Sequence, residues 1–256
     1  MTPDVSIVVP VFDEEGAVAP LAREIAAAFA GAACEILFVD DASADGTLAS
    51  LIAAKREIPQ LRVLSHARNA GQSRALRTGI AAARAPIIVT LDGDGQNDPA
   101  DAPALARALS EGPGEIAMIG GVRVRRRDPA AKRLASRLAN AVRRRLLADE
   151  ADDTGCGLKA FRREAFLKLA YFDHMHRYLP ALMRREGFGV RFQPVGHRSR
   201  ATGHSKYTNA GRLLAALFDL AGVLWLKSRN RDPGAVSEAL SDPSPLAGEG
   251  VGEADG

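Results

Sequence analysis

The 256-residue sequence contains few cysteines and no long uninterrupted apolar run. Its two cysteines, Cys34 and Cys156, are too few for a disulfide framework, so we expect both to be reduced thiols. No apolar stretch reaches the roughly 18 residues that a membrane-spanning helix needs. The N-terminus shows no basic-then-apolar signal segment. These absences predict a cytoplasmic protein with one sizeable core.

Several sequence motifs of nucleotide and hydrolytic enzymes are also missing. The loop at residues 10–15 has no Gly-x-Gly-x-x-Gly fingerprint, so a nicotinamide or flavin enzyme is not expected. There is no Gly-x-x-x-x-Gly-Lys-Ser/Thr phosphate loop, and the stretch 203–207 lacks the second glycine of a hydrolase elbow. The five histidines show no zinc-type spacing, and we expect His174 and His176 to be ordinary loop residues.

The first half of the sequence alternates short, β-branched apolar runs with helical segments. The predicted strands cover residues 5–9, 35–39, 61–64, 86–91 and 115–119. Helices are predicted to end near Ala30, to span about 46–57 and 72–84, and to begin at Pro99 with Asp98 as N-cap. This alternation predicts an α/β fold with a mostly parallel central sheet and helices on both faces.

Two carboxylates, Asp92 and Asp94, directly follow the apolar strand 86–91, and Gln96 comes two residues later. Like charges this close resist burial unless a cation joins them. Oxygen ligands suit Mg²⁺ or Mn²⁺, so Asp92, Asp94 and Gln96 are the predicted metal ligands. The alternative is a plain turn at a strand end, since Asp-Gly is common turn chemistry.

Polar residues also follow the other predicted strands, at the edge where parallel sheets bind ligands. They are Asp13, Glu14 and Glu15 after the first strand, Asp40 and Asp41 after the second, and Arg68 and Asn69 after the third. Four consecutive loops of this kind indicate a binding edge.

Residues 123–145 form the most basic part of the sequence, with ten Lys or Arg residues against one acidic residue, Asp128. The whole protein has a net charge of only +3, so the remainder is slightly acidic. A patch this one-sided predicts an anionic partner such as phosphate, anionic lipid or nucleic acid. The alternative is a solvated helix face.

Together these motifs resemble those of family 2 glycosyltransferases of the GT-A fold. The resemblance is strongest to dolichol-phosphate mannose synthases and bacterial polyprenyl-phosphate glycosyltransferases. It covers about residues 4–228 and rests on the ordered motifs at 6–14, 39–47, 68–72 and 92–96, with Asp13 where the family usually has Asn. It implies inverting transfer of mannose or another hexose from a GDP- or UDP-linked donor to a polyprenyl phosphate.

The resemblance implies roles for individual residues. Donor binding would involve Pro10, Phe12, Glu14, Asp40, Asp41, Asn69, Gln72 and Asp92. The implied catalytic residues are Asp92, Asp94, Arg123 and Asp153. Asp153 would be a base or the orienting partner of an arginine. A phosphate monoester needs little deprotonation, because its second pKa is about 6.

The acceptor phosphate would bind the second half of the protein. The implied contacts are Arg123, Lys132, Arg133, Ser136 and Lys206. Lys132 stands where the family usually has Arg, which keeps the charge but loses bidentate geometry, so Arg133 is a candidate to replace it.

The stretch 211–229 predicts an amphipathic helix on which Arg212 and Asp219 share one face and the opposite face is apolar. Such a helix would lie in the interface of an anionic membrane, at its inner face; core packing or a dimer contact is the alternative. We therefore expect one domain over 1–228, with a donor half at about 1–122 and an acceptor half at about 123–210. Residues 230–256 are expected to form a disordered tail.

Other function classes fit the sequence less well. A haloacid-type phosphohydrolase carries its Asp-x-Asp after the first strand, and a nucleotidyltransferase carries a Gly-rich first loop; neither feature is present. Nucleic-acid binding through 123–145 leaves the acidic strand-end loops unexplained, because they repel phosphate without a metal. A family 2 enzyme with a non-lipid acceptor and a homo-oligomeric state both stay open.

Overall fold

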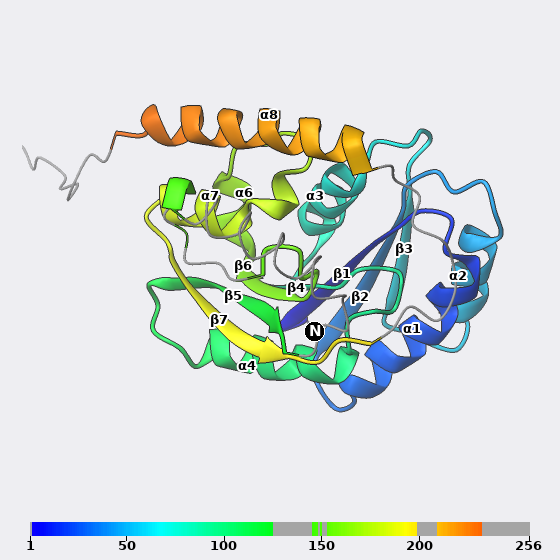
Figure 1. The fold of residues 1–256 in the computed structure, drawn as a ribbon. Helices are drawn as coiled ribbons and strands as arrows, with labels where there is room; N and C mark the ends of the chain where they lie inside the picture. The colour runs from blue at the N-terminus through cyan, green and yellow to red at the C-terminus, as the bar shows by residue number, and fades with distance from the viewer. Residues whose placement is uncertain (1, 125–144, 148, 150–152, 199–208, 232–256) are drawn as a thin grey trace, which may run out of the picture.

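A computed structural model describes residues 2–124, 145–147, 149, 153–198 and 209–231 (Figure 1). Its centre is a seven-stranded sheet of order β3-β2-β1-β4-β6-β5-β7. The strands are β1 Val5–Val11, β2 Cys34–Asp40, β3 Leu61–Ser65, β4 Ile87–Thr90, β5 Ile116–Arg123, β6 Lys159–Arg162 and β7 Gly189–Val195. All five strands predicted from the sequence are present, and β5 extends furthest beyond its predicted end.

The strand directions confirm a mostly parallel sheet. The first four strands are parallel to one another, and β5 is parallel to β7. Within the described ranges only β6 runs the opposite way, pairing antiparallel with both β4 and β5. The sequence analysis predicted neither β6 nor β7. Because Lys159 at the start of β6 pairs with Thr90 at the end of β4, the segment leading into β6 arrives at the ligand-binding edge.

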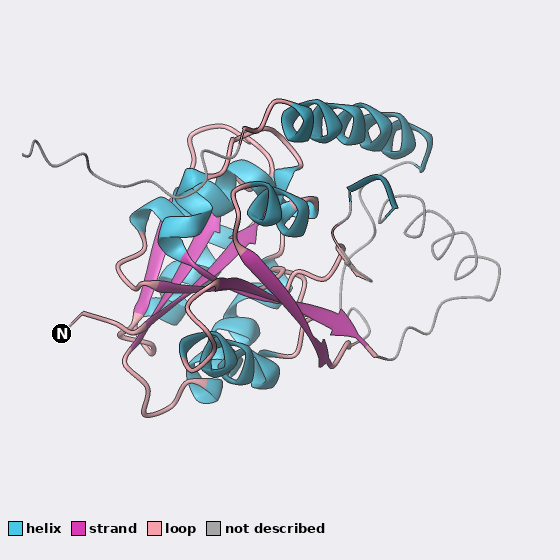
Figure 2. Cartoon of the chain, turned by 90° about the vertical axis from the view of Figure 1, so that its left-hand side faces the viewer, coloured by secondary structure: helices cyan, strands magenta, loops and turns pink. Residues whose placement is uncertain are grey.

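Helices cover both faces of the sheet, as predicted (Figure 2). One face carries α1 Glu15–Ala28, α2 Thr47–Lys55 and α4 Ala102–Ser110; the other carries α3 Gln72–Ala82, α6 Arg163–Lys168 and α7 Leu179–Arg185. Two short 3₁₀ turns are η1 Pro99–Asp101 and η2 Met175–Arg177, and α8 spans Asn209–Ser228. Asp98 caps η1 as expected, accepting the Ala100 N–H at 3.0 Å.

The apolar strand runs are explained by burial on both faces. In β1, Ile7 and Val9 enter the core beneath α1 and α4, whereas Val8 enters the core beneath α3. A strand covered on both sides needs no polar alternation, which is why β1 and β4 read as continuous apolar segments. Cys34 and Cys156 are free thiols, as expected.

Helix α8 lies outside the layer formed by α3, α6 and α7 (Figure 1). Val223 is fully buried against that layer, and the Tyr178 hydroxyl donates to the Ala216 carbonyl at 3.1 Å. Asp219 points toward the protein, with Oδ2 lying 3.0 Å from His174 Nδ1. The predicted polar face is therefore turned inward at Asp219.

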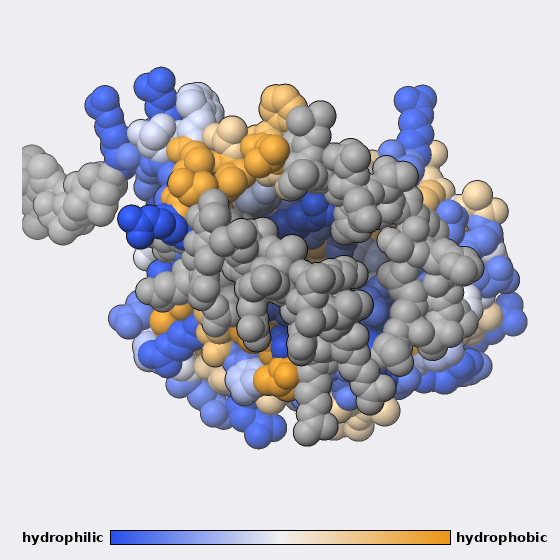
Figure 3. All heavy atoms as spheres, in the orientation of Figure 1, coloured by the Kyte–Doolittle hydropathy of each residue, from blue (hydrophilic) through white to orange (hydrophobic). Residues whose placement is uncertain are grey.

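The opposite face of α8 is apolar and exposed. Leu217, Phe218 and Trp225 are 56%, 71% and 59% exposed. In Figure 3, apolar residues drawn in orange gather at the top of the molecule, around α8. The expectation of packing on protein holds for the inward face of this helix, and contact of the exposed face with a membrane stays a prediction. Within the described ranges, no helix combines the length and the apolarity that crossing a bilayer requires.

Phe161→Ala should destabilise the fold severely. Phe161 is fully buried on β6 and stacks on Phe166 with ring centroids 5.3 Å apart. Removing such a ring costs about 3–5 kcal/mol, to be measured by urea unfolding. Phe218→Ala is the matched control, and its largely exposed ring should cost about 0.5 kcal/mol or less. Equal losses in the two variants would contradict this core assignment.

Candidate active site

Asp92 lies where the ends of β4 and β5 meet the segment that enters β6. Its N–H donates to Asn97 Oδ1 at 2.9 Å, and Gln72 Nε2 donates to its Oδ1 at 3.0 Å. The backbone of Gly157 passes directly against the carboxylate, since a Cβ there would lie 2.2 Å from Asp92 Cγ. Only a glycine leaves room for this approach. The structure therefore holds the Asp92 carboxylate in one defined place.

The charge environment of Asp92 is unfavourable for an isolated carboxylate. Burial raises its pKa, the charge of Asp94 raises it further, and Lys159, Arg123 and Gln72 oppose the shift. Asp94 is fixed by its own turn, with Oδ1 accepting the Gln96 N–H at 3.1 Å. Two neighbouring carboxylates that destabilise each other are the oxygen donors that a hard divalent cation stabilises.

The donor set also indicates what kind of cation site this is. In the part of the chain that the structure describes, no three His, Cys, Asp or Glu side chains cluster as a metal cage. With Asp92 and Asp94 as its protein ligands, a cation would keep most of its coordination positions for water and substrate phosphate. Mg²⁺ is usually bound in this way. The Gln96 carbonyl accepts the Arg198 N–H at 2.9 Å, and a ligand role for its side chain stays a prediction.

Arg123 and Asp153 form a bidentate ion pair beside Asp92. Arg123 Nε and Nη2 donate to the two carboxylate oxygens at 2.6 and 2.7 Å. Burial lowers the pKa of Arg123, but the hydrogen bond and charge of Asp153 outweigh it, so the net shift is upward. Because both oxygens of Asp153 are engaged, the geometry favours an orienting role for Asp153 over a base.

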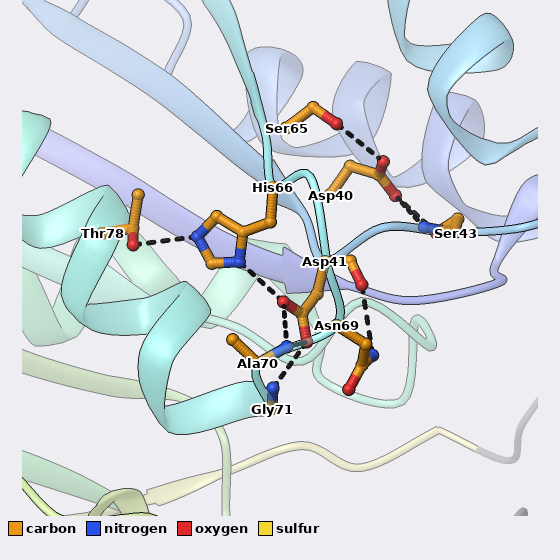
Figure 4. Close-up of polar contacts among 9 residues, drawn as sticks. All are labelled: Asp40, Asp41, Ser43, Ser65, His66, Asn69, Ala70, Gly71 and Thr78. Carbon is orange, nitrogen blue, oxygen red and sulfur yellow. Dashed lines mark hydrogen bonds and ion pairs between the residues drawn. The ribbon is translucent and has the colours of Figure 1, made fainter.

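Asp40 and Asp41 hold together the loops that follow β2 and β3 (Figure 4). The Asp41 carboxylate accepts the Ala70 and Gly71 N–H groups at 3.0 and 2.7 Å, and His66 Nδ1 lies 2.6 Å from it.

Two further contacts complete this network. Asn69 Nδ2 donates to the Asp41 carbonyl at 3.1 Å, and Asp40 accepts the Ser65 hydroxyl at 3.2 Å. Both carboxylates are buried and saturated by this chain's own donors. They fix the loops at this edge of the sheet, and the sequence analysis gave no signal for the part that His66 plays.

The loop after β1 is tied to the loop after β2. The Glu14 N–H donates to Thr47 Oγ1 at 2.8 Å, and Asp13 Oδ1 accepts the Ala44 N–H at 2.8 Å. Asp13 adopts a φ of 49°, which Asn and Asp tolerate better than most residues, so Asp can replace the family's Asn here. Pro10 lies near the end of β1, at the same edge of the sheet. Phe12 follows the strand and is 38% exposed.

A pocket of about 240 Å³ opens next to Asp92. Its lining is Gln72, Leu76, Thr90, Leu91, Asp92, Thr154, Gly155, Cys156, Gly157, Lys159, His176, Arg177 and Leu179. The prediction that His176 is an ordinary loop residue is wrong. Its Nδ1 is hydrogen-bonded to Ser73 Oγ at 2.7 Å, and burial holds its pKa well below the usual range.

The model of glycosyl transferase family 2 matches residues 6–170, which includes every strand end described above except that of β7. The chain belongs to glycosyltransferase family 2. It is therefore a glycosyltransferase, and the family expected from the motifs is confirmed.

Curated relatives extend the match toward the C-terminus. Dodecaprenyl-phosphate galacturonate synthase of Rhizobium johnstonii is 34% identical over 90% of this chain and 69% of its own length. Undecaprenyl-phosphate 4-deoxy-4-formamido-L-arabinose transferase of Pseudomonas paraeruginosa is 36% identical over 84% of this chain and 63% of its own length. The chain thus spans about two thirds of these relatives.

Solved structures confirm the GT-A fold. Glucosyl-3-phosphoglycerate synthase from Mycobacterium tuberculosis, in complex with Mn²⁺, UDP-glucose and glycerol 3-phosphate, superimposes with a TM-score of 0.68. It covers 91% of this chain and 82% of that one at 20% identity. At that identity the likeness concerns the fold.

Most of the implied acceptor site falls outside the described residues. Lys132, Arg133, Ser136 and Lys206 all lie there, as does the 230–256 tail from residue 232 onward. Of the implied acceptor contacts only Arg123 is described, and it lies at the same edge of the sheet as Asp92, paired with Asp153.

Gly157→Ala should damage the cation site without damaging the fold. The added Cβ would force the Asp92 carboxyl to move, because the two would otherwise lie 2.2 Å apart. Displacing a group that positions metal ligands typically lowers metal affinity about 10–100-fold, to be measured by Mn²⁺ titration. Gly114→Ala is the control, since nothing lies within 4 Å of its Cβ position. Unchanged Mn²⁺ affinity in Gly157→Ala would contradict the assignment.

Proposed function

We propose that this chain transfers a sugar from a nucleotide diphosphate sugar to a polyprenyl phosphate, with inversion at the anomeric carbon. The observation that carries the proposal is that Asp92 and Asp94 lie beside the Arg123–Asp153 pair, at the edge of the sheet where β4 and β5 end. This edge offers oxygen donors for a cation on one side and a partly buried guanidinium on the other. The names of both curated relatives describe sugar transfer involving a polyprenyl phosphate.

Donor binding is assigned to the loops after β1 to β4. Asp92 and Asp94 would hold Mg²⁺ or Mn²⁺, which supplies Lewis-acid stabilisation of the departing nucleoside diphosphate. The structural relative bound to Mn²⁺ and UDP-glucose supports this choice of cofactor and donor class. GDP remains a second candidate nucleotide. The networks of Asp40 and Asp41 would fix the loops that receive the nucleoside.

The proposed reaction needs no proton transfer. A phosphate monoester is mostly a dianion at pH 7, so one of its oxygens attacks the anomeric carbon directly. A bond from carbon to the acceptor oxygen forms as the bond from carbon to the diphosphate breaks. The diphosphate takes the electron pair, and the acceptor becomes a diester with one fewer charge. Asp153 then has no proton to remove and serves to orient Arg123, which steadies the anionic acceptor.

The direct test is a panel of UDP- and GDP-linked sugars, mannose included, with polyprenyl phosphate and Mn²⁺, scored by release of nucleoside diphosphate. Asp94→Ala should lower turnover at least about 100-fold, as loss of a principal electrostatic group does. Folding should persist, because Asp94 lies in a turn outside the core. Asp173→Ala, an exposed carboxylate on another loop, is the control. Full activity in Asp94→Ala, or in wild-type protein with EDTA, would refute the cation's role.

Membrane attachment through α8 accompanies this function. A polyprenyl phosphate lies in a membrane, and the exposed face of α8 carries Leu217, Phe218 and Trp225. Arg229 follows at the helix end, with its guanidinium 6.0 Å from the Trp225 ring centroid. An apolar helix face combined with cationic residues suits the interface of an anionic membrane, here the inner face. The basic segment 123–145 would add a second anchor.

Phe218→Asp should release the protein from vesicles of anionic lipid. The side chain is 71% exposed, so the substitution places a charge in the lipid contact without disturbing the fold. Ile52→Asp, on α2 with 52% exposure, is the control for adding charge to an exposed apolar site. Co-sedimentation with vesicles and circular dichroism are the measurements. If folded Phe218→Asp still co-sediments like wild type, the face does not contact lipid; a shift in its oligomeric state would indicate a dimer contact instead.

A further inference from the structure

Two basic side chains, Lys159 and Arg177, line the pocket beside Asp92. Lys159 lies at the start of β6, almost fully buried, and its ammonium donates to the Cys156 carbonyl. Arg177, the last residue of η2, also lines the pocket. The only acidic side chain in the pocket lining is Asp92. If a bound cation neutralises Asp92, no other acidic side chain of the lining can pair with Lys159 or Arg177.

Arg177 is the more informative of the two. Across the described ranges, its guanidinium has no carboxylate partner, whereas Arg123 next to the same pocket is bound bidentately by Asp153. Guanidinium groups present paired N–H donors that match a carboxylate. Arg177 therefore offers a binding position for an anion that arrives with a ligand.

The pocket walls make such a charge contact effective and limit what can enter. Leu76, Leu91 and Leu179 supply apolar surface, and electrostatic attraction is stronger where water is excluded. The volume of about 240 Å³ is smaller than the roughly 300–1,000 Å³ of pockets for drug-sized ligands. It suits a single sugar ring, with Gln72 and Thr154 available for its hydroxyl groups.

We infer that this pocket receives the sugar ring of the donor and that Arg177 and Lys159 select a sugar carrying a carboxylate, a uronic acid, over a neutral hexose. The inference rests on the proposed function, because it takes the cation and diphosphate to lie at Asp92 and Asp94. From there the group on the far side of the diphosphate enters the adjoining pocket. The acceptor phosphate is the alternative anion for these two side chains, and the experiments below separate the two.

The first experiment compares matched donors that differ only in a carboxylate or a hydroxymethyl group. The pairs are UDP-galacturonate with UDP-galactose, UDP-glucuronate with UDP-glucose, and GDP-mannuronate with GDP-mannose. Binding is measured by calorimetry with Mn²⁺ and no acceptor, and transfer by nucleotide release with polyprenyl phosphate. We expect at least one uronate to bind and react about 10-fold or more better than its neutral partner. Equal use of the neutral partners would overturn the inference.

The second experiment removes the charge. Arg177→Gln should weaken uronate binding by about 10-fold or more and leave the neutral donor within about threefold of wild type. Arg177→Lys should restore part of the preference, because it keeps charge without the bidentate fork. Lys168→Gln, a remote cation on α6 near Phe188, controls for loss of one positive charge. Arg177→Gln is preferred to a Lys159 variant because Arg177 is only half-buried and its loss should not unfold the chain.

The outcomes separate the two proposals. If Arg177→Gln raises the KM for polyprenyl phosphate equally with both donors, the cations serve the acceptor and the inference is wrong. If wild-type protein binds a uronate donor preferentially yet transfers no sugar to polyprenyl phosphate, the sugar inference stands and the proposed acceptor fails. If transfer occurs with no preference between matched donors, the proposed function stands and the sugar inference fails.

Discussion

The mutual repulsion of Asp92 and Asp94 at the end of a buried strand is the constraint around which the edge of the sheet is organised. Burial and the neighbouring charge both raise the pKa of Asp92, so the protein must offset an unfavourable carboxylate. It does so with a hydrogen bond from Gln72 and the charges of Lys159 and Arg123. Each of these interactions stabilises the charged form of Asp92, which is available to a ligand, more than it stabilises the fold.

The reversed direction of β6 makes that arrangement possible. Because β6 starts where β4 ends, the residues that lead into it, from Thr154 to Gly157, line the same pocket as Asp92, and Gly157 lies directly against its carboxylate. A parallel strand in that position would begin at the far edge of the sheet. The same reversal lets Asp153 meet Arg123 at the end of β5. Breaking a buried pair of this kind typically costs about 3–5 kcal/mol, so these two residues fix the wall of the site as well as its charge.

The sequence could predict the strands and the acidic edge because both depend on local signals. Apolar β-branched runs followed by polar residues recur four times, three of them with carboxylates, and the parallel fold brings their ends together. It could not predict β6, which is only four residues long and reads as part of a polar stretch. The sequence also could not predict the positions of Lys159 and His176. Their positions depend on pairing between segments about 70–100 residues apart, such as Thr90 with Lys159 and Ser73 with His176, which no local pattern encodes.

The exposed helix and the pocket are joined through one short segment. His174 contacts Asp219 of α8, and the Tyr178 hydroxyl donates to the Ala216 carbonyl of the same helix. Between these two anchors lie His176 and Arg177, which line the pocket. His174 adopts a left-handed backbone conformation, with a φ of 62°, which turns the segment back toward α3. The apolar face of α8 and the Arg177 side chain in the pocket are therefore held in fixed relation by the same turn of chain, so the exposed apolar surface and the pocket are parts of one packed unit.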